Sequence, residues 1–309
     1  MGLRAAVDYE IHAQILLRIV KIVACIWVLE RLWPAGGQPT PIGRVRNTTF
    51  YVINTLTMLH LPLVASWVFP SLPNVELLSN VLPGRLRTGL GGGVAMTLCY
   101  ALVWDFFQYW FHRLAHRSPL LWSIHVVHHR DPALNTTSSL RTGFGELVAG
   151  FYFVHIPTFL ICGGGMVPYY GSLVLFSGWG FVNHANVRLR LGPLAAWLSG
   201  PQTHRMHHGL AREYRNCNFA AFFTFYDRMF GTFRRPARGE WPATGVREAR
   251  SPRNILSESF VPQLRHRQSS RGGYAEPFPV RAAAQRQCEK ALPRFFRSTR
   301  RRTPSTAPP

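Results

Sequence analysis

The sequence predicts an all-α protein, a multi-pass bundle of helices that crosses a membrane. Three observations lead to this fold class. Hydrophobic residues make up 47% of the 309 residues and charged residues only 16%, well below the roughly 25% of a typical soluble domain. Several apolar stretches approach the roughly 20 residues that a helix needs to cross a bilayer. Histidines gather in three tight clusters close to these stretches.

The first candidate membrane helices lie in the N-terminal part of the chain. Residues 11–33 are apolar but contain Arg18, Lys21 and Glu30, so this stretch is expected either to span the bilayer or to lie in its interface. Residues 48–70 contain no charged side chain and are long enough to span. The alternative is a large soluble helical protein, which the low charge of the chain disfavours.

Three further apolar stretches follow in the middle of the chain. Residues 90–111 contain a single charged side chain, that of Asp105. Residues 147–162 and 166–183 are separated by three consecutive glycines, so we expect them to form a helical hairpin with a tight turn. Together with the N-terminal stretches, they predict an integral membrane protein with several spans.

Arginines indicate the orientation of the bundle. They are concentrated in the segments 113–141 and 188–228, and the positive-inside rule places both segments at the cytoplasmic face. Beyond about Arg265 the chain becomes rich in Arg, Ser and Pro, a composition typical of disorder. We therefore divide the chain into N-terminal membrane helices (1–89), a main domain (90–265) and a basic, disordered tail (266–309).

Eight of the 13 histidines form three clusters in the main domain. The first has the pattern H-x-x-x-H, and the other two share the pattern H-x-x-H-H. The clusters comprise His112 and His116; His125, His128 and His129; and His204, His207 and His208. Residues at i, i+3 and i+4 lie on one face of a helix, so each cluster is expected to aim its imidazoles at a common point.

This set of imidazoles predicts a metal site at the cytoplasmic face. Neutral imidazole suits iron, copper, zinc and nickel. Eight ligands exceed the four that one tetrahedral zinc ion uses, so two metal ions sharing the set is the economical interpretation. Iron is favoured if the chemistry involves O2. His184, at the end of the last apolar stretch, is a ninth candidate ligand. The isolated histidines at 12, 60, 155 and 266 are expected to be packing or surface residues.

Asp105 is expected to support this site from within the membrane helix. Asp105, Tyr109, His112 and His116 lie at offsets of 0, 4, 7 and 11, which places them along one stripe of a helix. An ionisable group inside an apolar span is costly and so suggests a function. We expect the Asp105 carboxylate to fix the tautomer of a metal ligand. The alternative is a capping or interhelical carboxylate.

Other kinds of site find no support in the motifs of the chain. The five cysteines are scattered without a C-x-x-C pair, which disfavours a thiolate zinc site. The patterns H-E-x-x-H, G-x-S-x-G and G-x-x-x-x-G-K-[ST] do not occur. The basic tail has few aromatic residues among its arginines, so we expect contact with anionic lipid rather than nucleic acid.

The clusters are embedded in longer motifs that extend over about residues 95–265. These motifs are D-F-F-Q-Y-W-F-H-R-L-A-H at 105–116; H-V-V-H-H at 125–129, followed by Asn135, Thr136, Arg141 and Glu146; N-H-A-N-V at 183–187; P-Q-T-H-R-M-H-H at 201–208; and Y-D-R-M-F-G-T-F at 226–233. In order and spacing they resemble the fatty acid hydroxylase / sterol desaturase superfamily of membrane di-iron enzymes. The chain differs from the usual pattern at Asn216-Cys217-Asn218 (Asn-Tyr-Gly), Tyr226-Asp227 (Trp-Asp) and Gly143-Phe144 (His-Pro).

The resemblance implies a membrane-bound oxygenase whose catalytic domain is residues 90–265. It implies two iron ions, O2 as co-substrate, a lipid substrate and an external electron donor such as a b-type cytochrome or a ferredoxin. It implies that Asn186 and Asp227, like Asp105 and Tyr109, support the metal ligands without binding the metal themselves. It requires no catalytic side chain beyond the metal ligands. The product is an alcohol or an alkene. A non-redox protein that transports or buffers zinc is the alternative from another class.

Overall fold

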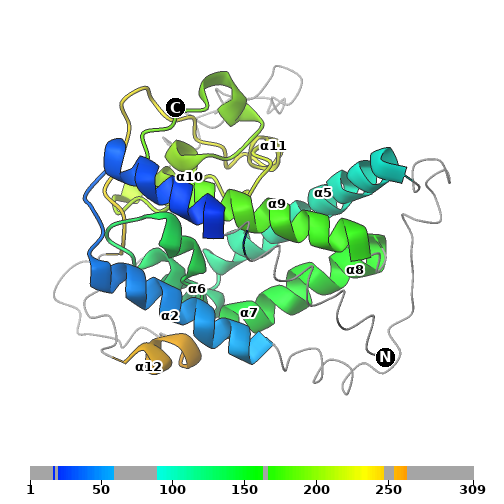
Figure 1. Cartoon of the computed structure of the whole chain (residues 1–309), viewed down its shortest axis with the longest axis horizontal. Helices are drawn as coiled ribbons and strands as arrows, with labels where there is room; N and C mark the ends of the chain where they lie inside the picture. Colours follow the sequence, from blue (N-terminus) through cyan, green and yellow to red (C-terminus); the bar gives the residue numbers. More distant parts are fainter. Residues whose placement is uncertain (1–16, 18–19, 59–88, 163–165, 247–253, 263–309) are drawn as a thin grey trace, which may run out of the picture.

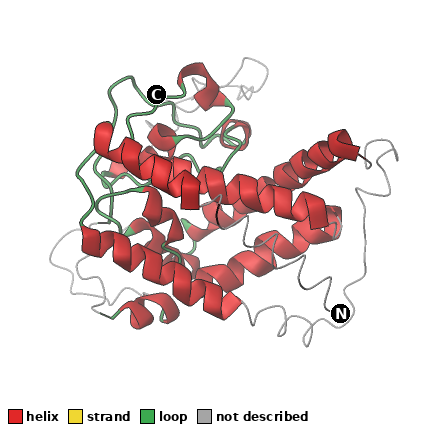
Figure 2. Ribbon diagram, in the orientation of Figure 1, coloured by secondary structure: helices red, strands yellow, loops and turns green. Residues whose placement is uncertain are grey.

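Helices form every regular element in the part of the chain that the computed structural model describes, residues 17, 20–58, 89–162, 166–246 and 254–262 (Figures 1 and 2). Within these ranges, β-type pairing is limited to two isolated antiparallel bridges, Pro34 with Val187 and Gly209 with Thr244. The all-α prediction is therefore confirmed for the described residues.

The long helices surround a centre made of short helices and loops. A helix at residues 20–32 comes first. The elements after it are α2 (Pro41–Met58), α5 (Gly89–Ala115), α6 (Pro119–His129), η2 (Thr136–Leu140), α7 (Phe144–Gly150), η3 (Phe151–His155), α8 (Ile156–Cys162), α9 (Met166–His184), η4 (Gly192–Ala196), α10 (Pro201–His207), η5 (Arg212–Tyr214), α11 (Phe225–Met229) and α12 (Ile255–Phe260).

Two of these helices are long and apolar enough to cross a membrane: α5, and the continuous helix Phe144–Cys162, in which the π-helical turn η3 joins α7 to α8. Within an apolar stretch of 18 residues in each helix, only 28% of the residues are buried in α5 and 11% in Phe144–Cys162. A core helix of a soluble protein would be mostly buried, so this exposure favours lipid contact. Figure 1 shows both helices extending to the same side, away from α10 and α11.

The other predicted spans have different outcomes. The stretch 166–183 forms α9, but its mean hydropathy is too low for it to count among the candidate spans. The stretch 48–70 begins in α2, and its second half lies outside the described residues, as does the predicted tail at 266–309. The stretch 11–33 contains the helix at 20–32.

Local sequence signals place the corner between α5 and α6. Ser118 is the N-cap of α6: its side chain accepts a hydrogen bond from the Leu121 amide, and Pro119 follows at the first helical position. After α6, the Asn135 and Ser138 side chains form a capping box around η2. The Ser118 cap fixes where α6, which carries the second histidine cluster, begins after α5, and the capping box fixes where η2 begins after α6.

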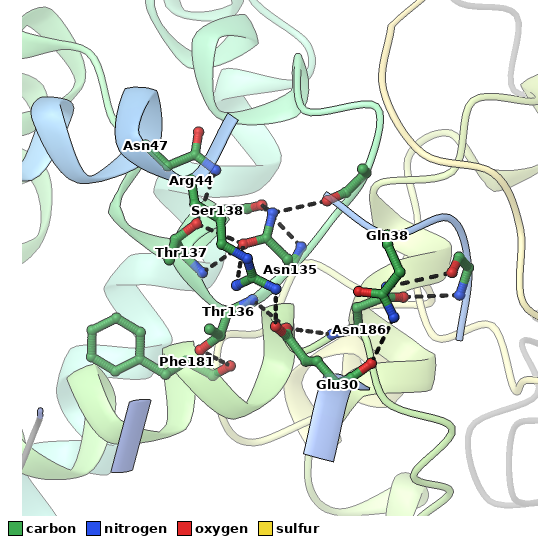
Figure 3. A network of polar contacts seen from close by, with 12 residues as sticks. Glu30, Gln38, Arg44, Asn47, Asn135, Thr136, Thr137, Ser138, Phe181 and Asn186 are labelled. Carbon is green, nitrogen blue, oxygen red and sulfur yellow. Dashed lines mark hydrogen bonds and ion pairs between the residues drawn. The ribbon is translucent and has the colours of Figure 1, made fainter. Parts of the chain in front are cut away.

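Glu30, a fully buried carboxylate, connects the N-terminal helix to this centre (Figure 3). One oxygen accepts hydrogen bonds from the amides of Thr136, at 2.7 Å, and Asn186, at 2.8 Å. The other pairs with the Arg44 guanidinium at 2.7 Å. Because Thr136 begins η2 and Asn186 follows α9, Glu30 holds together three parts of the chain that are far apart in sequence.

We expect Glu30→Ala to lower the free energy of unfolding by about 3 kcal/mol, because it leaves a partly buried arginine and two buried amides without their acceptor. Thermal unfolding of detergent-purified protein, followed by circular dichroism, measures this effect. Glu213→Ala is the control, since Glu213 is exposed. Equal melting temperatures for the two variants would contradict the assigned role of Glu30.

Candidate metal centre

Nine histidines meet at the centre of the described structure, in two adjoining groups. Site 1 consists of His112, His116, His125, His129 and His207, and site 2 of His128, His184, His204 and His208. Within each group, one ring nitrogen per residue lies within 4.8 Å of those of all the others. Eight of these side chains are buried, and His128 is partly buried. The structure thus brings together all nine residues that the sequence singles out as candidate ligands.

Four helices and the residues directly after them carry these histidines. His112 lies in the last turn of α5 and His116 directly follows that helix; α6 holds the second cluster, and α9 ends at His184. His204 and His207 lie in α10, and His208 is the C-cap of that helix. Each H-x-x-H-H cluster divides between the two sites. In α6, His125 and His129 contribute to site 1 and His128 to site 2; in α10, His204 and His208 contribute to site 2 and His207 to site 1.

This division differs from the expectation that each cluster aims at one point. The physical reason is helical geometry: residues i and i+4 lie only about 40° apart around the axis, whereas i+3 and i+4 lie about 100° apart. The i, i+4 pair therefore converges on one site, and the intervening i+3 residue points across to the other. The rings of His129 and His208, one from each site, stack with centroids 4.2 Å apart.

Oxygen acceptors fix the tautomer of five of the rings at Nδ1. The acceptors are the backbone carbonyls of Phe219 for His112 (2.7 Å), Cys217 for His207 (2.9 Å), Arg141 for His128 (3.1 Å) and Gly180 for His184 (2.7 Å), and the Glu146 carboxylate for His125 (2.7 Å). A nitrogen that faces an oxygen acceptor must carry the proton, so Nδ1 donates and Nε2 keeps its lone pair.

The free lone pairs face one another. His128 and His184 both donate through Nδ1, yet their Nε2 atoms lie 3.1 Å apart. The Nε2 of His204 lies 3.0 Å from that of His184 and 3.1 Å from that of His208. Protonation does not relieve this repulsion, because burial lowers the pKa of His128 to about 4 and that of His184 well below its usual value.

Site 1 has the same character. The Nε2 atoms of His112 and His207 are buried without a hydrogen-bond partner. Burial also lowers the pKa of His125 to about 3, so this ring is neutral at physiological pH. Metal–nitrogen bonds of about 2.0–2.1 Å place neighbouring ligand nitrogens about 3 Å apart, which is the spacing observed here. The donor set of each group therefore fits metal ions that prefer imidazole.

The acidic residues predicted to support the ligands act on a loop. Asp105 accepts hydrogen bonds from the amides of residues 221–223, and Asp227 accepts them from the amides of Phe219 and Ala220 and from the Thr232 hydroxyl. Neither carboxylate bonds a histidine ring; both orient the loop whose Phe219 carbonyl anchors His112. For Asp105 this contact differs from the expected bond to a metal ligand and from the alternative of a capping or interhelical carboxylate.

Tyr109 and Asn186 likewise lie behind the histidines. The Tyr109 hydroxyl bonds the Thr232 hydroxyl at 2.9 Å, and Asn186 bonds Gly36 and the Arg205 guanidinium.

In the loop that contains Phe219, Asn218 has a positive φ of 56°, at the position where the family usually has Gly. Asn tolerates this left-handed conformation better than most residues, so the departure from the pattern preserves the turn.

Glu146 is the carboxylate that performs the tautomer-fixing role expected of Asp105. It lies in the first turn of α7, and its Oε1 accepts a hydrogen bond from His125 Nδ1 at 2.7 Å. The sequence showed Glu146 only as part of the family resemblance. Its distance of 21 residues from His125 and its place on a different helix leave no spacing signal that would connect the two.

An all-helical scaffold with nine convergent imidazoles defines a class of protein built to hold metal ions beside apolar helices. Residues 97–232 match the model of the fatty acid hydroxylase family. The chain is 34% identical to alkylglycerol monooxygenase of Xenopus tropicalis over 129 residues, which are 42% of this chain and 28% of that protein. Over this region, the chain is similar to members of the fatty acid hydroxylase superfamily.

Two further relatives cover a larger share of the chain. Ornithine lipid hydroxylase OlsE of Rhizobium tropici is 29% identical over 171 residues, 54% of this chain and 49% of its own length. Very-long-chain aldehyde decarbonylase GL1-10 of Oryza sativa subsp. japonica is 28% identical over 167 residues, 52% and 54% of the two chains. The chain thus spans between about a quarter and a half of the length of these relatives. No solved structure matches it significantly.

We expect Glu146→Ala to weaken metal binding about 10–100-fold, because the His125 ring loses the acceptor that orients it and raises its basicity. Competition with a chelator of known affinity measures the change. Glu240→Ala is the matched control, since Glu240 pairs with Arg234 at 2.8 Å and bonds no histidine side chain. Unchanged affinity in Glu146→Ala would show that His125 needs no such partner.

We also expect the metal-free protein to lose stability as the pH falls from about 6.5 toward about 4. Unfolded histidines have a pKa of about 6.5, whereas burial holds the pKa of His125 at about 3 and of His128 at about 4. Over this window the unfolded chain therefore binds protons that the folded protein excludes, at up to about 1.4 kcal/mol per histidine and pH unit. Melting temperatures at pH 7.5 and 5.0 test the expectation, and a flat profile would contradict it.

Proposed function

We propose that this protein is a membrane-bound oxygenase that uses two iron ions, O2 and external electrons to hydroxylate or desaturate a lipid C–H bond. The observation that carries the proposal is the pair of adjoining histidine sites with unprotonated Nε2 atoms turned inward. Similarity to an alkylglycerol monooxygenase and an ornithine lipid hydroxylase supports oxygen insertion into a lipid.

The residues of the chain perform three tasks in this mechanism. The nine imidazoles bind through their inward nitrogens, while Glu146 and the backbone carbonyls keep the Nδ1 protons in place. Trp122 and Phe219 pack against rings of site 1, and Tyr109 packs against Phe219, so that aromatic side chains cover this side of the site. When bound, the iron ions supply the activation of O2, a reaction for which no side chain is suited.

The overall reaction needs electrons from outside the chain. Hydroxylation converts R–H, O2, two electrons and two protons into R–OH and water. Desaturation with the same inputs gives an alkene and two waters. We propose a b-type cytochrome or a ferredoxin as the donor. The chemistry of the site does not select among lipid substrates, and the relatives act, by their names, on several kinds.

We propose a multi-pass arrangement in which the metal centre faces the cytoplasm. The C-terminal end of α5 and the N-terminal end of the helix Phe144–Cys162 both reach the histidines, as His112 and Glu146 show. Both helices can therefore cross the bilayer with the centre at one face, where a lipid can reach it from the side. The segments 113–141 and 188–228 carry many arginines, which favours the cytoplasmic side. In this proposal, residues 1–89 supply further membrane helices, residues 90–265 form the catalytic domain, and residues 266–309 contact anionic lipid.

We expect His128→Ala (site 2) and His207→Ala (site 1) each to reduce lipid oxidation by more than about 100-fold. Removing a metal ligand should cost more activity than removing a residue that only hydrogen-bonds a ligand, which costs about 10–100-fold. His155→Ala is the control and should retain substantial activity, because His155 lies in η3 against Trp104 and belongs to neither site. Lipid mass spectrometry of expressing cells, normalised to membrane-extracted protein, measures the product.

Elemental analysis of the same preparations tests the metal. About two irons per chain in the unchanged protein support the proposal. Zinc alone, without iron-supported oxidation, would instead identify the non-redox alternative, a protein that transports or buffers zinc. Full turnover in both histidine variants would show that the sites are not the active centre.

A further inference from the structure

Glu258 is a buried carboxylate that lies outside the region shared with the fatty acid hydroxylase family. It belongs to α12, which packs against α2 and α7 in Figure 1, and its side chain is 1% exposed. Three arginines converge on it: Arg141 at 2.6 Å, Arg130 at 3.4 Å, and Arg46. Its negative charge offsets the mutual repulsion of three guanidinium groups, of which that of Arg141 is buried and those of Arg130 and Arg46 are partly buried.

One of these arginines connects Glu258 to site 2. Arg141 donates from Nε to the Val127 carbonyl at 2.8 Å, next to His128 in α6. The backbone carbonyl of Arg141 accepts a hydrogen bond from His128 Nδ1, with 3.1 Å between the two atoms. The position of Arg141 therefore sets the direction in which the His128 Nε2 points. Without the Glu258 charge, mutual repulsion among the three arginines would displace Arg141.

Glu30 makes the corresponding connection from the N-terminal side. Through the Asn186 amide it fixes the segment that follows His184, and the Asn186 side chain in turn bonds Arg205, the neighbour of His204. Thr136, the other amide bonded to Glu30, donates from its hydroxyl to the Phe181 carbonyl of α9. Two further ligands of site 2 are thereby held from outside the family region.

Site 1 has a different set of supports. His112 is anchored on the loop that Asp105 and Asp227 hold, and His125 is anchored on Glu146. All three carboxylates lie within residues 97–232, the segment matched by the family model. The acidic residues that support the two sites are thus separate sets, and they come from different parts of the chain.

We propose that Glu258 and Glu30 are positioning residues for site 2 alone, so that metal binding at site 2 can be lost while site 1 keeps its ion. The proposal rests on the proposed two-metal function. It assigns a metal-organising role to segments on both sides of the family region, and it makes the occupancy of the second site depend on the contacts of α12 with α2 and α7.

Binding of Co2+ to the metal-free, full-length protein in detergent tests this proposal, with the visible absorption of the bound ion reporting its coordination. The unchanged protein should bind about two equivalents and Glu258→Gln about one. Adding His204→Ala to Glu258→Gln should change nothing further, whereas adding His112→Ala should abolish the remaining equivalent. Glu240→Gln, which disturbs an ion pair of 2.8 Å away from the histidine side chains, should bind about two.

The outcomes separate this proposal from the proposed function. Fewer than about two equivalents in the unchanged protein would contradict the two-metal function itself. Two equivalents in Glu258→Gln, or loss of both with helix content preserved, would overturn the site-specific role. If Glu258→Gln does not fold, Arg141→Lys removes the Nε bond to Val127 while keeping the charge beside Glu258. It should also bind about one equivalent, and two would again overturn the proposal.

Discussion

The structure depends on keeping nine imidazoles unprotonated and in contact. Nδ1 bonds fix the tautomer of five rings, and their Nε2 atoms approach other nitrogens at about 3 Å or lie buried without a partner. Lone pairs in this arrangement repel one another, and burial opposes the protons that would relieve the repulsion. A metal ion is the group that converts the repulsion into attraction, and without one the scaffold alone must hold the rings.

The scaffold meets this demand with buried acidic residues. The chain has a net charge of +21 and only 14 acidic residues, yet Glu30, Asp105, Asp131, Asp227 and Glu258 are all buried. Each accepts hydrogen bonds from backbone amides, polar side chains or guanidinium groups of the segments that surround the histidines. A carboxylate can take several such bonds at once, so a few of them suffice to fix several elements.

The two sites share their helices, and this couples them mechanically. Because α6 and α10 each contribute ligands to both sites, moving either helix changes both ligand sets. Independence can arise only from the groups that orient individual side chains. The Nδ1 anchors supply it: a carbonyl or carboxylate can turn one ring while the helix stays in place. For this reason, the two sites differ more in the groups that orient their histidines than in the helices that carry these histidines.

The sequence by itself determined the local features of this protein. Apolar stretches predicted α5 and the helix ending at Cys162. Helical spacing singled out eight of the nine histidines that the structure brings together, and the ninth, His184, was singled out by its place at the end of an apolar stretch. Such patterns are readable because a helix repeats every 3.6 residues, so spacing reports which face a side chain occupies. Asp105 could be recognised as a buried acid because it is the single charged residue in an apolar stretch.

Only the tertiary structure decided how these parts combine. Glu30 bonds an amide 106 residues away, Arg141 pairs with Glu258 across 117 residues, and Asp105 holds a loop 116 residues further on. The division of each H-x-x-H-H cluster between two sites likewise depends on where the neighbouring helices lie. Periodicity specifies the direction of a side chain from its own helix but not what it meets there, because its partners are brought to it by the packing of distant segments.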